Sequence, residues 1–189
     1  MNHNEIEAIV RTVLEKAAGG QSQVGQASTF AENTVATVGG QVAANGGLVQ
    51  TTMTLEMATK LIGKIEAKAA EWGMRVVTAV ADASGRPVAV HCMDGAYIGS
   101  FDVALNKTYT SIAFQMSTAE LGKLAQPGES LYGIQFTNEG KIVIFGGGEV
   151  LKRKGVIIGA LGVSGGSAKQ DTELAAYGKK VFEEVIACL

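Results

Sequence analysis

Few side chains in this sequence can carry acid–base or metal chemistry. The 189 residues include two histidines, His3 and His91, and two cysteines, Cys92 and Cys188. The sequence has no phosphate-binding loop motif, no zinc-protease motif and no hydrolase nucleophile motif. Acid–base catalysis would therefore depend mainly on carboxylates or lysines.

Four such residues flank or follow the first expected hairpin: Asp82, Asp94, Asp102 and Lys107. Each aspartate also fits a structural role, either in a turn or at the start of a helix. No catalytic residue is assigned, with Asp94 and Lys107 as weak candidates. A small-molecule lyase or isomerase that uses one of them is kept as an alternative.

His91 is the residue best suited to bind a cofactor metal. It lies near the end of an expected strand, followed by Cys92 and Met93, and strand alternation puts His91 and Met93 on one face. One histidine cannot build a zinc site, but it can supply an axial ligand to a tetrapyrrole whose ring already gives four nitrogens. The alternative is a half-buried strand histidine with hydrogen-bonded nitrogens.

Glycine is the outlier in the composition, because 25 of the 189 residues, about 13%, are glycine, against a usual share of about 7%. Two glycine clusters stand at expected strand ends, where glycine allows positive φ or the close approach of a flat ligand. Backbone N–H groups before the helix at Ser167 could receive an anion such as a propionate. The alternative is tight turns. The cluster residues expected to bind a cofactor are Gly146, Gly147, Gly148, Gly165 and Gly166.

Residues 51–189 read as one globular domain of class α+β, an antiparallel β-sheet with helices packed on it. Thr54, Ser117 and Ser167 are expected helix caps, and Asp82–Gly85 is an expected hairpin turn. Helices are expected at 55–72, 100–116, 117–126 and from 168 onward, and strands at 75–81, 87–93, 141–145 and 156–163, with a basic turn at 152–155.

The first 50 residues differ in character from the rest. Residues 1–18 form an amphipathic pattern, followed by a Gly/Gln-rich segment at 19–50 that is typical of a flexible linker. A short helix of this kind gains order by docking on a partner. Its apolar face is formed by Ile6, Ile9, Val10, Val13, Leu14 and Ala17.

Charge and hydropathy exclude several classes of protein. The net charge of −2 argues against nucleic acid as a partner, because that requires a basic face. No apolar run reaches the roughly 20 residues of a membrane helix. Two cysteines give neither a disulfide framework nor a zinc site. We therefore expect a cytoplasmic protein without a nucleic-acid or membrane partner.

The glycine-rich strands resemble a known family. Residues 126–133, 142–148 and 158–166, with Asp171 downstream, are similar to the C-terminal domain of PduO and to GlcG-like and HbpS-like haem-binding proteins. The resemblance implies a profilin-like sandwich that self-associates and binds haem or cobalamin. Adenosyl transfer belongs to a separate PduO domain that residues 1–50 could not encode, so we do not expect that activity, and an enzyme is disfavoured.

Residues 1–18 also resemble the encapsulation peptides of bacterial microcompartment cargo. This resemblance implies a location in the microcompartment lumen, with shell or cargo proteins as partners of the helix. The leading hypothesis is an accessory protein that binds a tetrapyrrole for cofactor handling or redox support. A second alternative function is a ligand-free scaffold that organises cargo at the shell. For the helix at 1–18, the alternative to targeting is oligomerisation.

Overall fold

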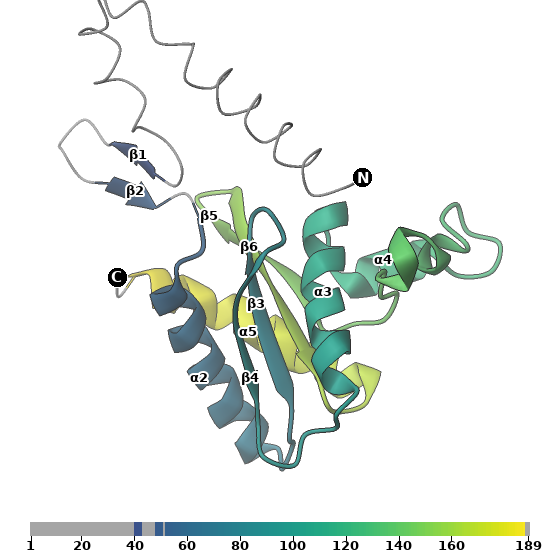
Figure 1. The fold of residues 1–189 in the computed structure, drawn as a ribbon, viewed down its shortest axis with the longest axis horizontal. Coiled ribbons are helices and arrows are strands. Elements are labelled where there is room, and N and C mark those ends of the chain that lie inside the picture. Colours follow the sequence, from purple (N-terminus) through teal and green to yellow (C-terminus); the bar gives the residue numbers. More distant parts are fainter. Residues whose placement is uncertain (1–39, 43–47, 51, 188–189) are drawn as a thin grey trace, which may run out of the picture. The chain divides into compact units, whose positions relative to one another are not determined.

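The computed structural model describes residues 40–42, 48–50 and 52–187 of the chain (Figure 1). It confirms the expected α+β class, with one antiparallel four-stranded sheet in the order β4-β3-β6-β5 and helices on both faces. The helices are α2 (Leu55–Glu71), α3 (Ser100–Phe114), α4 (Thr118–Leu124) and α5 (Ala168–Ala187), and the sheet strands are β3 (Val77–Asp82), β4 (Pro87–Cys92), β5 (Gly148–Arg153) and β6 (Val156–Ser164).

The expected helix at 1–18 and most of the segment at 19–50 lie outside the described residues. Within that segment, β1 (Gly40–Val42) and β2 (Leu48–Gln50) pair as a short antiparallel ladder. The sequence pattern gave no indication of these two strands. None of the described helices is long and apolar enough to cross a membrane.

Local hydrogen bonds confirm the expected helix starts. The Thr54 hydroxyl accepts from the N–H of Met57 at 3.2 Å. Ser117 and Glu120 form a reciprocal capping box, in which each side chain accepts from the other residue's backbone N–H. Ser167 does the same with Gln170 before α5. These caps satisfy N–H groups that a helix leaves without an internal partner.

The first hairpin is closed by the turn that the sequence indicates. Asp82 Oδ1 accepts from the N–H groups of Ser84 and Arg86, at 2.9 and 3.1 Å, and Gly85 has a positive φ of 78°. This turn sets the antiparallel register in which Thr78 faces His91. The hairpin thereby fixes the position of His91 on the edge strand β4.

The prediction of a strand at 141–145 is wrong. These residues follow two 3-10 turns, η1 (Ile134–Phe136) and η2 (Asn138–Gly140), and form no ladder. The N–H of Val143 donates to the Thr110 hydroxyl at 3.0 Å, so α3 satisfies this backbone instead of a neighbouring strand.

The true strand is β5, which contains part of the expected basic turn at 152–155. Lys152 and Arg153 belong to the ladder with β6, and the connection is reduced to Lys154 and Gly155, both with positive φ. Two left-handed residues match the twist of a tight hairpin. The correction places Gly148 in the sheet, where it pairs with Gly162.

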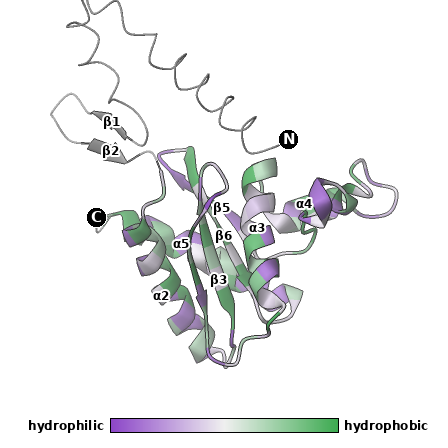
Figure 2. Cartoon of the chain, in the orientation of Figure 1, coloured by the Kyte–Doolittle hydropathy of each residue, from purple (hydrophilic) through white to green (hydrophobic). Residues whose placement is uncertain are grey.

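The two faces of the sheet are packed differently. Helices α2 and α5 lie on one face and α3 on the other (Figure 1), and apolar residues concentrate toward the sheet between them (Figure 2). The larger core lies on the α2 and α5 side, where bulky side chains meet: Met57, Leu61, Ile62, Ile65, Val80, Leu161, Leu174 and Phe182. Burial of these side chains supplies most of the hydrophobic stabilisation.

On the opposite face, small residues let α3 approach the sheet. A Cβ on Gly162 would collide with the backbone carbonyl of Ala104 in α3, and one on Gly148 would lie 2.8 Å from the carbonyl oxygen of Lys107. Ala79 is fully buried in the same layer. Backbone atoms of α3 therefore contact the strands almost directly, and this brings Lys107 over the sheet.

This close approach gives a testable prediction for stability. Gly162→Ala should lower the free energy of unfolding by at least about 2 kcal/mol, because a backbone oxygen, and not a mobile side chain, occupies the space. Gly63→Ala is the matched control, since nothing lies within 4 Å of its Cβ position on the exposed side of α2. It should be neutral or stabilise by up to about 1 kcal/mol. Chemical denaturation measures both, and equal stability of the two variants would contradict the packing argument.

Candidate functional site

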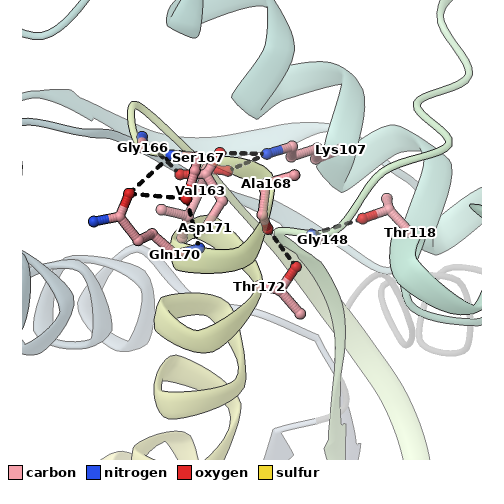
Figure 3. A network of polar contacts seen from close by, with 10 residues as sticks. All are labelled: Lys107, Thr118, Gly148, Val163, Gly166, Ser167, Ala168, Gln170, Asp171 and Thr172. Carbon is pink, nitrogen blue, oxygen red and sulfur yellow. Dashed lines mark hydrogen bonds and ion pairs between the residues drawn. The ribbon is translucent and has the colours of Figure 1, made fainter.

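A buried charged network lies where α3, β6 and the start of α5 meet (Figure 3). The side chain of Lys107 has no solvent exposure, and that of Asp171 is 4% exposed. Lys107 Nζ donates to Asp171 Oδ2 at 2.8 Å and to the Val163 carbonyl at 2.7 Å. It also lies 5.0 Å from the ring centroid of Phe145. The ammonium group thus has acceptors on α5 and β6 and a ring face beside it.

The network orders the glycine-rich connection as well. Asp171 Oδ1 accepts from the N–H of Gly166 at 2.9 Å, while the Thr118 hydroxyl accepts from the N–H of Gly148 at 2.9 Å. Burial lowers the pKa of the Lys107 ammonium, and the charge and hydrogen bond of Asp171 oppose that shift. A fully buried ammonium offers no surface to a substrate, so this geometry favours a structural role for Lys107.

The structure gives the five candidate glycines close neighbours within the chain. A Cβ on Gly147 would lie 2.5 Å from Lys107 Nζ, and Gly146 and Gly148 meet Thr172 and Thr118 in the same way. Binding of a ligand by these three glycines stays a prediction, and we leave them out of the site built below.

The second cluster, at the end of β6, is also closely packed. Gly165 lies against the backbone of Arg75 and Val76, and Gly166 against Met74 and Gln170. The N–H groups at this helix start are bound by Asp171 and Gln170, so the expected anion position already has internal acceptors. A ligand role for both glycines stays a prediction.

His91 lies away from this network, on β4, the edge strand that is farthest from β5 in the sheet. Its Nδ1 is 3.0 Å from Glu66 Oε1 on α2, and the two side chains are 43% and 30% exposed. In the neutral imidazole, a proton on Nδ1 donated to Glu66 leaves the lone pair on Nε2. Nε2 has no hydrogen-bond partner among the described residues. A carboxylate on one ring nitrogen and a free second nitrogen is the arrangement of many metal-ligating histidines.

A surface groove of about 490 Å³ lies beside this pair. It includes Glu66 itself, together with Arg75, Cys92, Met93 and Asp94. The structure therefore brings Met93 and Asp94 to the groove beside the His91–Glu66 pair. Lys107 belongs to the buried network, and Gly146–Gly148 lie at the start of β5 and just before it, so none of them lines this groove.

The hydroxyl of Thr78 supplies a further polar atom near His91. Thr78 is directly opposite His91 in the β3–β4 ladder, is fully buried, and its Oγ1 has no hydrogen-bond partner. An unpaired buried hydroxyl is unusual in a folded protein. Because Thr78 has no solvent exposure, a ligand at the surface would not reach this hydroxyl, so the ligating capacity here is that of the free Nε2 of His91.

The donor set fits an axial ligand better than a free metal ion. Among the described residues, no group of three or more His, Cys, Asp or Glu side chains could hold a metal ion. One imidazole oriented by Glu66 is sufficient for a tetrapyrrole, whose ring supplies the remaining nitrogens. Glu66 was not found from the sequence, because it precedes His91 by 25 residues and its half-buried position on α2 carries no distinguishing pattern.

Comparison with known families and curated proteins identifies the relatives of this chain. Residues 53–180 match the family described as haem degrading protein HbpS-like. A 15.0 kDa protein from the dhaT-dhaS intergenic region of Citrobacter freundii, described as uncharacterized, is 44% identical over 71% of this chain and 94% of its own length. The corrinoid adenosyltransferase PduO of the same organism is 40% identical over 57% of this chain, but the match spans 32% of that relative.

A solved structure supports the fold assignment. The structure of a PduOC:heme complex is 34% identical in sequence and superimposes with a TM-score of 0.66, covering 68% of this chain and 94% of the other. The profilin-like sandwich expected for GlcG- and HbpS-like proteins is therefore the fold of this chain.

The buried pair predicts a non-additive effect of mutation. Lys107→Met should lower the free energy of unfolding by about 3–5 kcal/mol, because the charge of Asp171 would remain buried without its cationic partner. The double variant Lys107→Met/Asp171→Leu should recover part of that loss. Lys60→Met is the control: it breaks the exposed Lys60–Glu56 pair and should leave stability nearly unchanged. Denaturant titration tests this, and a Lys107→Met variant as stable as Lys60→Met would contradict the role assigned to the pair.

Proposed function

This chain belongs to the HbpS-like family, and on that premise we propose that it is an accessory protein that binds a tetrapyrrole, haem first and cobalamin as the alternative. The observation that carries the proposal is the His91–Glu66 pair, whose carboxylate lines the surface groove. By binding the tetrapyrrole, the protein would take part in cofactor handling or redox support. The heme in the PduOC structure supports haem as the first ligand to test.

The residues around the groove have distinct parts in this proposal. Glu66 orients the imidazole and keeps Nε2 free, while Met93 provides an apolar and polarisable contact for a flat ring. The Arg75 guanidinium suits the carboxylate of a propionate group. Bound haem would supply the iron centre, and the protein would supply its axial ligand and its position.

We further propose that the protein is a homo-oligomer. Three large apolar side chains follow β4 and begin α3: Tyr97, Ile98 and Phe101, of which Ile98 is 96% exposed. A cluster of this kind is typical of a surface that another protein covers. It lies on the segment that directly follows the groove residues Met93 and Asp94, so association of copies would narrow the solvent access of that groove.

The cellular location proposed is the lumen of a bacterial microcompartment in the cytoplasm. Support comes from the amphipathic pattern at 1–18 and from the similarity to PduO. In this proposal the apolar residues Ile6, Ile9, Val10, Val13 and Leu14 dock on a shell or cargo protein, while residues 52–187 hold the cofactor.

Haem binding is tested by absorbance titration of the full chain with haemin. The wild type should give a saturable Soret shift that is lost or altered in His91→Ala, and Glu66→Gln should weaken binding by about 10–100-fold. His3→Ala is the matched control, because it removes the other histidine, and should retain the wild-type spectrum. A parallel titration with cobalamin tests the alternative ligand.

The outcomes separate the two parts of this proposal. An unchanged Soret band in His91→Ala would reject the axial ligand but keep haem binding. The absence of a spectral change in the wild type with haemin and with cobalamin would reject tetrapyrrole binding altogether.

Targeting is tested with a fluorescent fusion in cells that form microcompartments. Deletion of residues 1–18 should disperse the punctate signal of the full chain. Ile9→Glu should do the same, because it places a charge on the apolar face, whereas Thr12→Glu on the opposite face should preserve the puncta. Puncta that persist after the deletion would place the targeting signal elsewhere.

A further inference from the structure

A second surface groove, of about 520 Å³, lies at the other edge of the sheet beside β5. The end of α3, helix α4, strand β5 and helix α5 all contribute to it. Its volume falls in the range of small-molecule sites. Because β4 and β5 are opposite edges of the sheet, this groove is separate from the His91 site. Its lining consists of Gln115, Met116, Glu120, Lys123, Leu124, Val150, Lys152 and Lys179.

The groove has an excess of positive charge, although the chain as a whole carries −2. Lys179 is compensated by Glu149 at 2.8 Å. Glu120 is engaged in the capping box, where hydrogen bonds from the backbone N–H and the hydroxyl of Ser117 lower its pKa. Lys123 acts on Glu120 only through its charge and makes no hydrogen bond with it. Lys123 and Lys152 are therefore the two lysines of the lining to consider next.

Lys152 is the clearest case. Within the described part of the chain, its ammonium group makes neither a hydrogen bond nor an ion pair. Lys123 likewise makes no salt bridge with a described residue. The lining has three lysines and one carboxylate, Glu120, so its net charge is positive and an anion is favourable there.

The floor between these lysines is apolar. Val150 is 4% exposed, and Met116 and Leu124 lie beside it in the lining. A flexible methionine adapts to ligands of different shape. The combination of an apolar floor and a cationic rim matches a ligand with one charged end and one apolar end.

The backbone at Gln115 supports a binding role for this edge. Gln115 ends α3 in the left-handed conformation, with φ 55° and ψ 29°. Glycine or asparagine is the usual residue at such a helix end, because a longer side chain is strained there. This glycine-rich chain instead keeps an exposed amide at the groove, and strained residues of this kind concentrate at ligand sites.

We propose that this groove binds a small amphipathic organic anion. Lys123 and Lys152 hold its carboxylate or phosphate group, and Met116, Leu124 and Val150 contact its short apolar chain. Gln115 provides a hydrogen-bonding amide at the rim. The inference concerns binding alone and is independent of tetrapyrrole binding at His91.

Isothermal titration calorimetry of the full chain tests the proposal with hexanoate, hexyl phosphate and hexanol as probes. At least one of the two anions should bind saturably, and the comparison between them identifies the preferred charged group. Hexanol should bind more weakly, because it lacks the charge. Lys123→Gln/Lys152→Gln should weaken anion binding at least tenfold.

Lys169→Gln/Lys180→Gln is the matched control, since it removes two exposed lysines of α5 outside the groove and should keep the wild-type affinity. His91→Ala should also keep it, which separates this site from the haem site. The proposal is overturned if neither anion binds up to about 10 mM. It is equally overturned if the groove double variant binds as tightly as the control.

Discussion

The contact on which the rest of this fold depends is the buried ion pair between Lys107 and Asp171. It joins α3 to the start of α5, and the second bond of Lys107, to the Val163 carbonyl, adds the central strand β6. A buried charge is tolerated only when its partner and its hydrogen bonds are held in place. The close approach of α3, made possible by Gly148 and Gly162, is therefore required by the pair as well as by packing.

This constraint explains why both surface grooves described above lie at the edges of the sheet. The central strands β3 and β6 are covered on both faces. The space beside the glycines next to the ion pair is filled by other atoms of the chain itself. The edge strands β4 and β5 have no further strand beside them in this sheet. Each edge has a groove: one is lined by Arg75 and by Glu66, the partner of His91, and the other by three lysines and several apolar side chains.

Features with short sequence separation were predictable, and those with long separation were not. Thr54, Ser117 and Ser167 cap helices through partners three residues away, so the sequence alone located these helix starts. The apolar run at 142–145 was misread because its backbone bonds to Thr110, more than 30 residues earlier. Glu66 and Asp171 were missed as partners for the same reason: 25 and 64 residues separate them from the groups they bind.

The two basic side chains singled out in the sequence show how burial decides function. Lys107 and His91 each contact one carboxylate at about 3 Å, so the pairs are alike in chemistry. Full burial uses the hydrogens of Lys107 within the fold, and its charge serves to fix three elements. Partial exposure leaves one nitrogen of His91 accessible, and its carboxylate orients the ring without enclosing it. Residue type alone could not separate these roles, because the difference arises from the faces and edges of the sheet on which the residues lie.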